Sequence, residues 1–260
     1  MTAGAAPAPL ILAEPRGPVL VLRLNRPAVR NAFDLATALE FEAAMDRFDG
    51  DAALRVAVVT GGPDFFCAGV DLRAAAGGTR PRTAGRGWFG FNERPPAKPV
   101  IAAVEGPALA GGFELALACD LIVASRTSQF GLPEVGRGLI ASAGALVRLP
   151  GRVPAAIAAQ LALTGQPMPA ERLFQLGLVN LLSEPGAALE AALALAGRIA
   201  ANAPLSVLAS KRVLQLRHQP SEAQAWAAQE REFEAVRSSE DYREGLRAFA
   251  EKRKPEFHGR

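Results

Sequence analysis

The sequence predicts an α/β protein in which repeated units of two strands and one helix precede a helical C-terminal region. Three short apolar runs, each rich in small or β-branched residues and followed by turn residues, have the character of buried strands: 18–24, 54–60 and 100–104. From Pro204 onward the pattern is helical throughout. We therefore expect a layered core over residues 1–195 and a helical region over residues 196–260. These helices are expected to pack outside the core, where another subunit is one candidate partner.

Composition places the chain among ordinary globular proteins. Of its 260 residues, 50% are hydrophobic and 21% are charged, which excludes a disordered chain. Glu105, Glu114 and Asp120 divide the longest apolar stretch, so no membrane span is expected, and the first residues lack the basic start of a signal peptide. A net charge of +3 is too small to indicate a nucleic-acid partner. Cys67 and Cys119 form no disulfide framework, which favours a reducing, cytoplasmic location.

The first two units each open with a predicted strand. Residues 18–24 form the first strand, and a helix from Asp34 to Phe48 follows it, with Asp34 as a natural N-cap. The second unit has a strand at 54–60 and, after a turn of glycine and proline, a second short strand at 65–68. Asp71 can cap the helix that comes next.

The segment 77–98 is rich in Gly, Arg and Pro and has Trp88, Phe89 and Phe91 near its centre. Its arginines are too few, and its aromatic residues too dominant, for an RNA-binding segment. We expect a mobile flap over a pocket.

Residues 99–123 are the most informative stretch, because they are almost continuously apolar yet carry two glycines and a carboxylate at their centre. A helix should begin near Gly111 and Gly112, where the first backbone N–H groups have no partner within the helix. Glycine lets a ligand reach those groups, and the helix dipole favours an anion. Glu114 either complements the dipole on a solvated face or lines a cavity. Its apolar neighbours leave almost no polar face, which makes the cavity a competitive alternative to the solvated face.

The second half of the chain is mainly helical, and other catalytic motifs are missing from it. Helices are predicted at 154–163, 170–176 and 187–201. The letters G-x-G-x-x-A at 136–141 match a dinucleotide-binding fingerprint, but no strand leads into them and no acid follows about 20 residues later. The sequence has no P-loop and no G-x-S-x-G motif. Its two histidines lie in the polar tail, which argues against a Ser-His-Asp hydrolase and against a histidine-ligated metal.

Three motifs together resemble one known family. They are FCAGVDL at 66–72, GPALAGGFELALACD at 106–120 and FGLPEVGRGL at 130–139. In this combination the sequence resembles the enoyl-CoA hydratase/isomerase, or crotonase, family over nearly its whole length. The resemblance implies a crotonase-like spiral of β-β-α units with a C-terminal helical region that makes homotrimers or homohexamers. It also implies an acyl-CoA substrate, with coenzyme A as part of that substrate and no separate cofactor or metal.

The resemblance assigns catalytic roles to four residues. The backbone N–H groups of Val70 and Gly111 are expected to hold the thioester oxygen and to stabilise the charge that develops on it. Glu114 and Glu134 match the two catalytic glutamates of the hydratases. Hydration of a 2-enoyl-CoA needs a base that takes a proton from water at C3 and an acid that gives one to C2. By resemblance, Glu114 activates the water and Glu134 handles the C2 proton, which yields a 3-hydroxyacyl-CoA.

The resemblance also implies where coenzyme A and the acyl chain bind. Trp88, Phe89 and Phe91 are expected to line the acyl pocket or its lid. The backbone of Ala68 is expected near the adenine, whereas Asp71 already has a structural role as an N-cap. Lys252 and Arg253 either approach the CoA phosphates, from a neighbouring subunit, or form a solvated basic helix end. The full set of substrate-binding candidates is Val29, Arg30, Ala32, Ala68, Gly69, Asp71, Leu72, Pro133 and Lys252.

The chain departs from the family pattern at two places, and several activities remain open. Ala110 stands where many members have a third glycine, and residues 140–142 lack a common proline. Neither change removes a catalytic group. A hydratase of fatty-acid or related acyl-CoA degradation is the leading hypothesis, because both glutamates are present. The alternatives are an isomerase that uses only Glu134, a thioester hydrolase or decarboxylase, and a non-catalytic protein that binds RNA or a partner protein.

Overall fold

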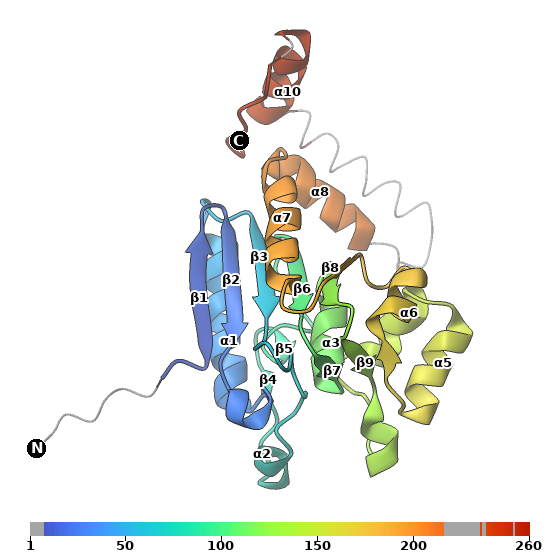
Figure 1. Cartoon of the computed structure of the whole chain (residues 1–260). Coiled ribbons are helices and arrows are strands. Elements are labelled where there is room, and N and C mark those ends of the chain that lie inside the picture. The colour runs from blue at the N-terminus through green and yellow to red at the C-terminus, as the bar shows by residue number, and fades with distance from the viewer. Residues whose placement is uncertain (1–7, 216–234, 236–237, 252) are drawn as a thin grey trace, which may run out of the picture.

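A six-stranded sheet in the order β1-β2-β3-β6-β8-β11 forms the centre of the fold (Figure 1). The protein is seen in a computed structural model, in which the structure describes residues 8–215, 235, 238–251 and 253–260. β1 is antiparallel to β2, and the other neighbouring pairs are parallel. The strands are β1 (Ile11–Arg16), β2 (Val19–Leu24), β3 (Val56–Thr60), β6 (Val100–Val104), β8 (Leu121–Ser125) and β11 (Leu181–Ser183).

The strands divide their side chains between two hydrophobic cores. In β3, Ala57 and Val59 belong to one core and Val56 and Val58 to the other, as the two-residue period of a strand requires. Residues of α1 (Leu35–Gly50) and α3 (Gly111–Ala118) fill the first core. Helix α7 (Ala188–Ala200) covers the second with a stripe of alanines. The central strands are therefore apolar on both faces, which explains their continuous hydrophobic runs.

Most elements predicted for the first half of the chain are confirmed, and one strand is not. The three strands predicted there correspond to β2, β3 and β6. Asp34 caps α1 by accepting a hydrogen bond from the backbone N–H of Thr37 at 2.9 Å, and Asp71 caps α2 (Leu72–Ala76). The strand predicted at 65–68 is wrong, because this segment makes only one bridge, between Cys67 and Ala108. Phe66 and Cys67 of this segment are buried in the first core instead.

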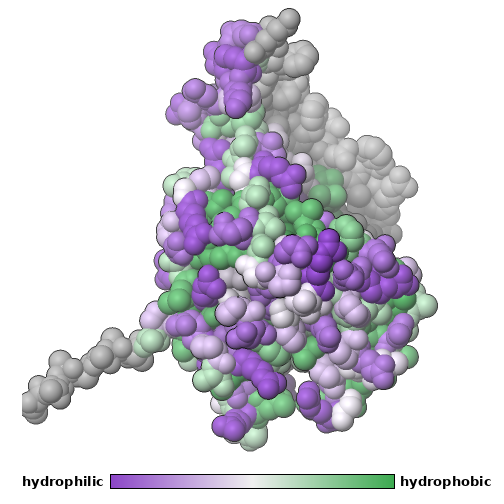
Figure 2. Space-filling model, in the orientation of Figure 1, coloured by the Kyte–Doolittle hydropathy of each residue, from purple (hydrophilic) through white to green (hydrophobic). Residues whose placement is uncertain are grey.

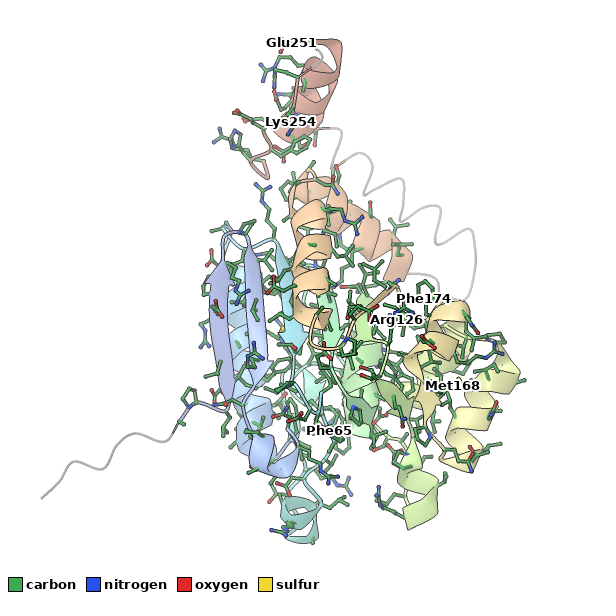
Figure 3. The ribbon with its side chains drawn as sticks, viewed as in Figure 1. Phe65, Arg126, Met168, Phe174, Glu251 and Lys254 are labelled. Carbon is green, nitrogen blue, oxygen red and sulfur yellow. The ribbon has the colours of Figure 1, made fainter. Side chains whose placement is uncertain are left out.

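A second sheet of three short strands continues from β6 and β8. Its order is β10-β9-β7, with β7 (Pro107–Leu109), β9 (Gln129–Gly131) and β10 (Met168–Pro169). β7 precedes α3 and β9 precedes the 3-10 helix η2 (Pro133–Arg137), so the predicted order of two strands and a helix is present. Arg126, which faces α6 (Ala170–Gln175) in Figure 3, pairs with Glu171 at 3.2 Å and Glu184 at 3.0 Å. Strands this short have no readable periodicity, and the sequence therefore did not reveal them.

The segment 77–98 is packed against the core, and the prediction of a flap over the pocket is wrong for its centre. It forms the hairpin β4 (Arg82–Thr83) and β5 (Gly87–Trp88). The Phe89 ring lies 5.0 Å from that of Phe33, the Phe91 ring lies 5.7 Å from that of Phe41, and all four side chains are fully buried. Arg86 pairs with two aspartates of α1 at 2.8 Å each. Trp88 alone of the three predicted aromatic residues lines a cavity.

The helices predicted in the second half of the chain are confirmed as α5, α6 and α7, with small differences at their ends. α5 spans Ala155–Thr164, and the other helical elements of the described residues are η1 (Pro27–Val29), α4 (Ala145–Arg148), η3 (Leu149–Gly151), α8 (Pro204–Gln215) and α10 (Glu240–Glu251). Among the described residues no single helix is long and apolar enough to cross a membrane. α7 and α8 pass that test only as a pair bent by 108°.

The C-terminal region is joined to the core at specific points. Lys211 of α8 is buried and pairs with Asp120 at 2.7 Å. Arg55 donates hydrogen bonds to the carbonyls of Ala200 and Phe257 at 2.9 and 2.8 Å. Helix α10, whose end Figure 3 marks with Glu251, stands apart from the sheet. The predicted division at residue 195 falls inside α7, which packs on the sheet.

Helix α3 begins from an unusual backbone conformation. Its N-cap, Ala110, has φ 52° and ψ −128°, a region that glycine occupies readily and alanine does not. The first residues of the helix need this sharp entry because β7 ends directly before it, at Leu109.

Replacing Ala110 with glycine is expected to stabilise the protein by about 1 kcal/mol, because a side chain in such a region costs roughly 1–3 kcal/mol. For a chain of this size, that gain raises Tm by about 2–4 °C in thermal unfolding. The matched control is Ala116→Gly in the same helix, which is expected to lower stability by about 1 kcal/mol. A loss of stability in both variants would show that Ala110 is not strained.

Candidate active site

A cavity of about 640 Å³ lies where three segments distant in sequence meet. One segment runs from Ala68 through α2 to Trp88, the second is the start of α3, and the third comprises η2 and the turn after it. In Figure 1, α2 and the yellow-green segment that follows β9 form the two lower tips of the molecule. Figure 2 shows a notch between these two tips.

Two backbone segments touch at the inner end of the cavity. A Cβ built on Gly69 would lie 2.5 Å from the backbone nitrogen of Gly111, and one built on Gly112 would lie 2.0 Å from the carbonyl oxygen of Cys67. Any side chain at these positions would push the segments apart. Glycine is therefore required here for close packing, and the contact holds Val70 beside the start of α3.

The N–H groups of Val70 and Gly111 are both available at this contact. Phe33 bonds to the two neighbours of Val70: its N–H donates to the carbonyl of Gly69, and its carbonyl accepts from the N–H of Asp71, both at 2.8 Å. Gly111 is the first residue of α3, so its N–H has no acceptor within the helix. In the part of the chain that the structure describes, neither N–H has a hydrogen-bond acceptor, and both residues line the cavity.

Glu114 projects from the first turn of α3 into the cavity and is only 3% exposed. Its Oε1 accepts a hydrogen bond from the N–H of Ala145 at 3.0 Å. Burial raises the pKa of Glu114 to about 7, and the nearby charge of Glu134 adds to this rise, whereas the bond from Ala145 opposes it. Glu114 is therefore a cavity carboxylate and not an acid on a solvated face.

Glu134 lies opposite, in the first turn of η2, and also lines the cavity. Burial raises the pKa of its carboxyl, and the charge of Arg137 partly offsets that rise. Its Oε2 is buried and has no hydrogen-bond partner among the described residues. An uncompensated carboxylate oxygen is costly, which is typical of a group that meets a ligand or exchanges a proton.

A buried network behind Glu114 holds the turn that binds it. Asn92 donates to the carbonyl of Ala143 at 2.9 Å, and Arg148 donates to the carbonyl of Asn92. Arg148 is close enough to Glu114 to lower its pKa slightly. The sequence did not reveal Asn92, Ala145 or Arg148, because a backbone donor and two polar side chains in separate segments form no motif.

Two segments predicted to bind coenzyme A, one around Arg30 and one around Ala68, lie side by side. The N–H of Ala68 donates to the carbonyl of Arg30 at 3.0 Å. The guanidinium of Arg30 lies over the ring of Phe65, 5.7 Å from its centre, and Figure 3 shows Phe65 at the same end of the molecule as α2. Ala68 and Leu72 line the cavity itself.

The other predicted binding residues surround this region without lining the cavity. Val29 is on the surface and Ala32 is buried below it. Gly69 makes the backbone contact with Gly111, and Pro133 is the first residue of η2. Asp71 has structural partners, since it caps α2 and pairs with Arg26 at 3.2 Å. Lys252 lies outside the described residues.

The cavity also contains two cations that sequence analysis did not select, Arg80 and Arg137. The sequence contained a signal for Arg137, because this residue follows Glu134 by three positions in the same motif. No group of three or more His, Cys, Asp or Glu side chains suited to a metal ion occurs among the described residues.

Comparisons with known proteins show to which family the chain is similar. A family model described as enoyl-CoA hydratase/isomerase matches residues 14–260. Carnitinyl-CoA dehydratase of Proteus mirabilis is 41% identical over 253 residues, which cover 94% of this chain and 97% of the relative. For 2,3-dehydroadipyl-CoA hydratase of Escherichia coli the values are 39% over 251 residues, 93% and 96%.

Solved structures show the same likeness. The crystal structure of enoyl-CoA hydratase from Mycobacterium tuberculosis superposes with a TM-score of 0.94 at 53% identity and covers 97% of this chain and 100% of its own. A carnitinyl-CoA hydratase from Mycobacterium avium gives a TM-score of 0.78 at 42% identity, with coverages of 98% and 100%. The family model, the relatives and the fold agree, and the chain therefore belongs to the enoyl-CoA hydratase/isomerase, or crotonase, family.

Proposed function

We propose that this enzyme adds water across the double bond of 2-enoyl-CoA thioesters and forms 3-hydroxyacyl-CoA. The observation that carries the proposal is that Glu114 and Glu134 line one cavity together with two backbone N–H groups that lack acceptors among the described residues. The names of the relatives support the same class of reaction, since one is a dehydratase and another a hydratase of CoA thioesters.

The backbone groups suit the electrostatic part of this reaction. When water attacks C3 of an enoyl thioester, negative charge develops on the thioester oxygen. Donors from Val70 and Gly111 are fixed in place by the contact at Gly69 and need no rearrangement to meet that charge. One such donor contributes about 2.7–4 kcal/mol to lowering the barrier in comparable sites.

The two glutamates suit the proton transfers. A base works best when its pKa is near the working pH, and burial places the pKa of Glu114 at about 7. We assign Glu114 to the water and Glu134, whose pKa burial also raises, to the proton that arrives at C2. These groups supply acid, base and charge stabilisation, so the proposed reaction needs no cofactor beyond the coenzyme A of the substrate. The trimer or hexamer and the cytoplasmic location stay predictions.

Substitution of either glutamate is expected to slow hydration by about 10²–10⁴-fold, because each removes one proton-transfer group. The assay follows the loss of enoyl absorbance from crotonyl-CoA and identifies the product. Glu105→Gln is the matched control, since Glu105 is also buried and accepts a backbone N–H, from Ala188 at 2.9 Å, but does not line the cavity. If the double variant Glu114→Gln, Glu134→Gln hydrated crotonyl-CoA as fast as the unsubstituted enzyme, this mechanism would be excluded. A shifted enoyl-CoA as the product would instead indicate an isomerase.

The rate of hydration is expected to fall as the pH drops below about 7, because the pKa of Glu114 is raised to about 7 and only its unprotonated form accepts a proton from water. The measurement is kcat/KM for crotonyl-CoA between about pH 5 and pH 9 at constant ionic strength. Glu105→Gln should reproduce the parent profile. A rate that stays constant down to pH 5 would exclude a base with this pKa.

A further inference from the structure

Two arginines line the cavity without a carboxylate at ion-pair distance among the described residues. Arg80 follows α2 and Arg137 is the last residue of η2, so the cations come from two different segments of the cavity wall. Both are exposed, and neither forms an ion pair within the described ranges 8–215, 235, 238–251 and 253–260. Other arginines of the 77–98 segment, Arg82 and Arg86, are paired with carboxylates at 2.7–2.8 Å.

The cavity combines these two cations with two carboxylates. Its acidic residues are Glu114 and Glu134, and burial raises the pKa of both, which disfavours their negatively charged forms. Guanidinium groups stay charged at any physiological pH. An acyl group that enters the cavity meets two cations, Arg80 and Arg137, and the charge of Arg137 also acts on the neighbouring carboxyl of Glu134.

An apolar wall completes the cavity around these cations. It includes Leu72, Ala75, Trp88, Leu139 and Ile140. The thioester is expected at Val70 and Gly111, so an acyl chain would pass along this wall before its far end meets a guanidinium. Figure 2 shows hydrophilic residues on both sides of the notch at this end of the molecule.

We propose that Arg80 and Arg137 bind a carboxylate at the far end of the acyl chain, so that the preferred substrates are CoA monothioesters of dicarboxylic acids. Arginine is suited to this task because its planar fork pairs with both carboxylate oxygens. The proposal rests on the proposed hydratase function for its substrate, but the subsite is measurable by binding alone. The CoA phosphates are the other anions that the arginines can meet, and the experiment separates the two.

The test compares two thioesters of equal chain length, 2,3-dehydroadipyl-CoA and 2-hexenoyl-CoA, which differ at the far end by a carboxylate or a methyl group. We expect the parent to favour the dicarboxylic substrate in kcat/KM. Arg80→Gln and Arg137→Gln should each lower this preference about fivefold, the upper range for an exposed ion pair. Arg73→Gln is the matched control, because Arg73 is exposed on α2 but does not line the cavity, and it should leave the preference unchanged.

Binding of the saturated analogues, adipyl-CoA and hexanoyl-CoA, measured by calorimetry, makes the result independent of turnover. A preference for adipyl-CoA that both variants reduce supports the subsite even if neither enoyl substrate is hydrated, in which case only the hydratase function fails. Equal affinity for the two analogues in the parent overturns the subsite. An equal loss for both analogues in the variants also overturns it, because the arginines would then serve the CoA phosphates.

Discussion

The approach of two backbones at Gly69 and Gly112 is the constraint on which the site depends. A Cβ on either glycine would lie 2.0–2.5 Å from the opposite main chain, so the loop after β3 and the start of α3 are in contact only because no side chain separates them. This contact places Val70 beside Gly111 and directs Glu114 into the cavity. The buried phenylalanines below it, Phe33 and Phe89, fix the loop from the other side. The geometry of the helix start thus depends both on its own glycines and on the segments packed around it.

The sequence predicted those parts of the molecule that follow from local pattern. Apolar strands such as β3 and caps such as Asp34 are visible in it, because periodicity and capping act over a few residues. Strands of two or three residues, the packing of Phe89 and Phe91, and the turn that bonds to Glu114 depend on segments far apart in the chain. The flap predicted from Gly, Arg and Pro content failed for the same reason, since composition does not reveal that Arg86 pairs with α1.

Three kinds of chemical group line the cavity: backbone N–H groups, carboxylates and guanidinium groups. Main-chain N–H groups stand where the thioester is expected, two carboxylates stand where protons would move, and two arginine side chains lie on the outer wall. The family resemblance identified the first two groups from the motifs around Gly111 and Glu134, and left acyl preference open. The arginines occupy exposed segments, where substitution costs little stability. Substrate preference can therefore change there without disturbing the core.

The strained backbone at Ala110 can be relieved by a single change in the gene. Ala110 lines the cavity, and its backbone is held where glycine would be relaxed. Every alanine codon becomes a glycine codon through one change at its second base. A single nucleotide substitution therefore produces Ala110→Gly. Random mutagenesis would reach that substitution readily. Continued presence of alanine under such mutational access would mean that the methyl group does something for the site that outweighs its cost to folding.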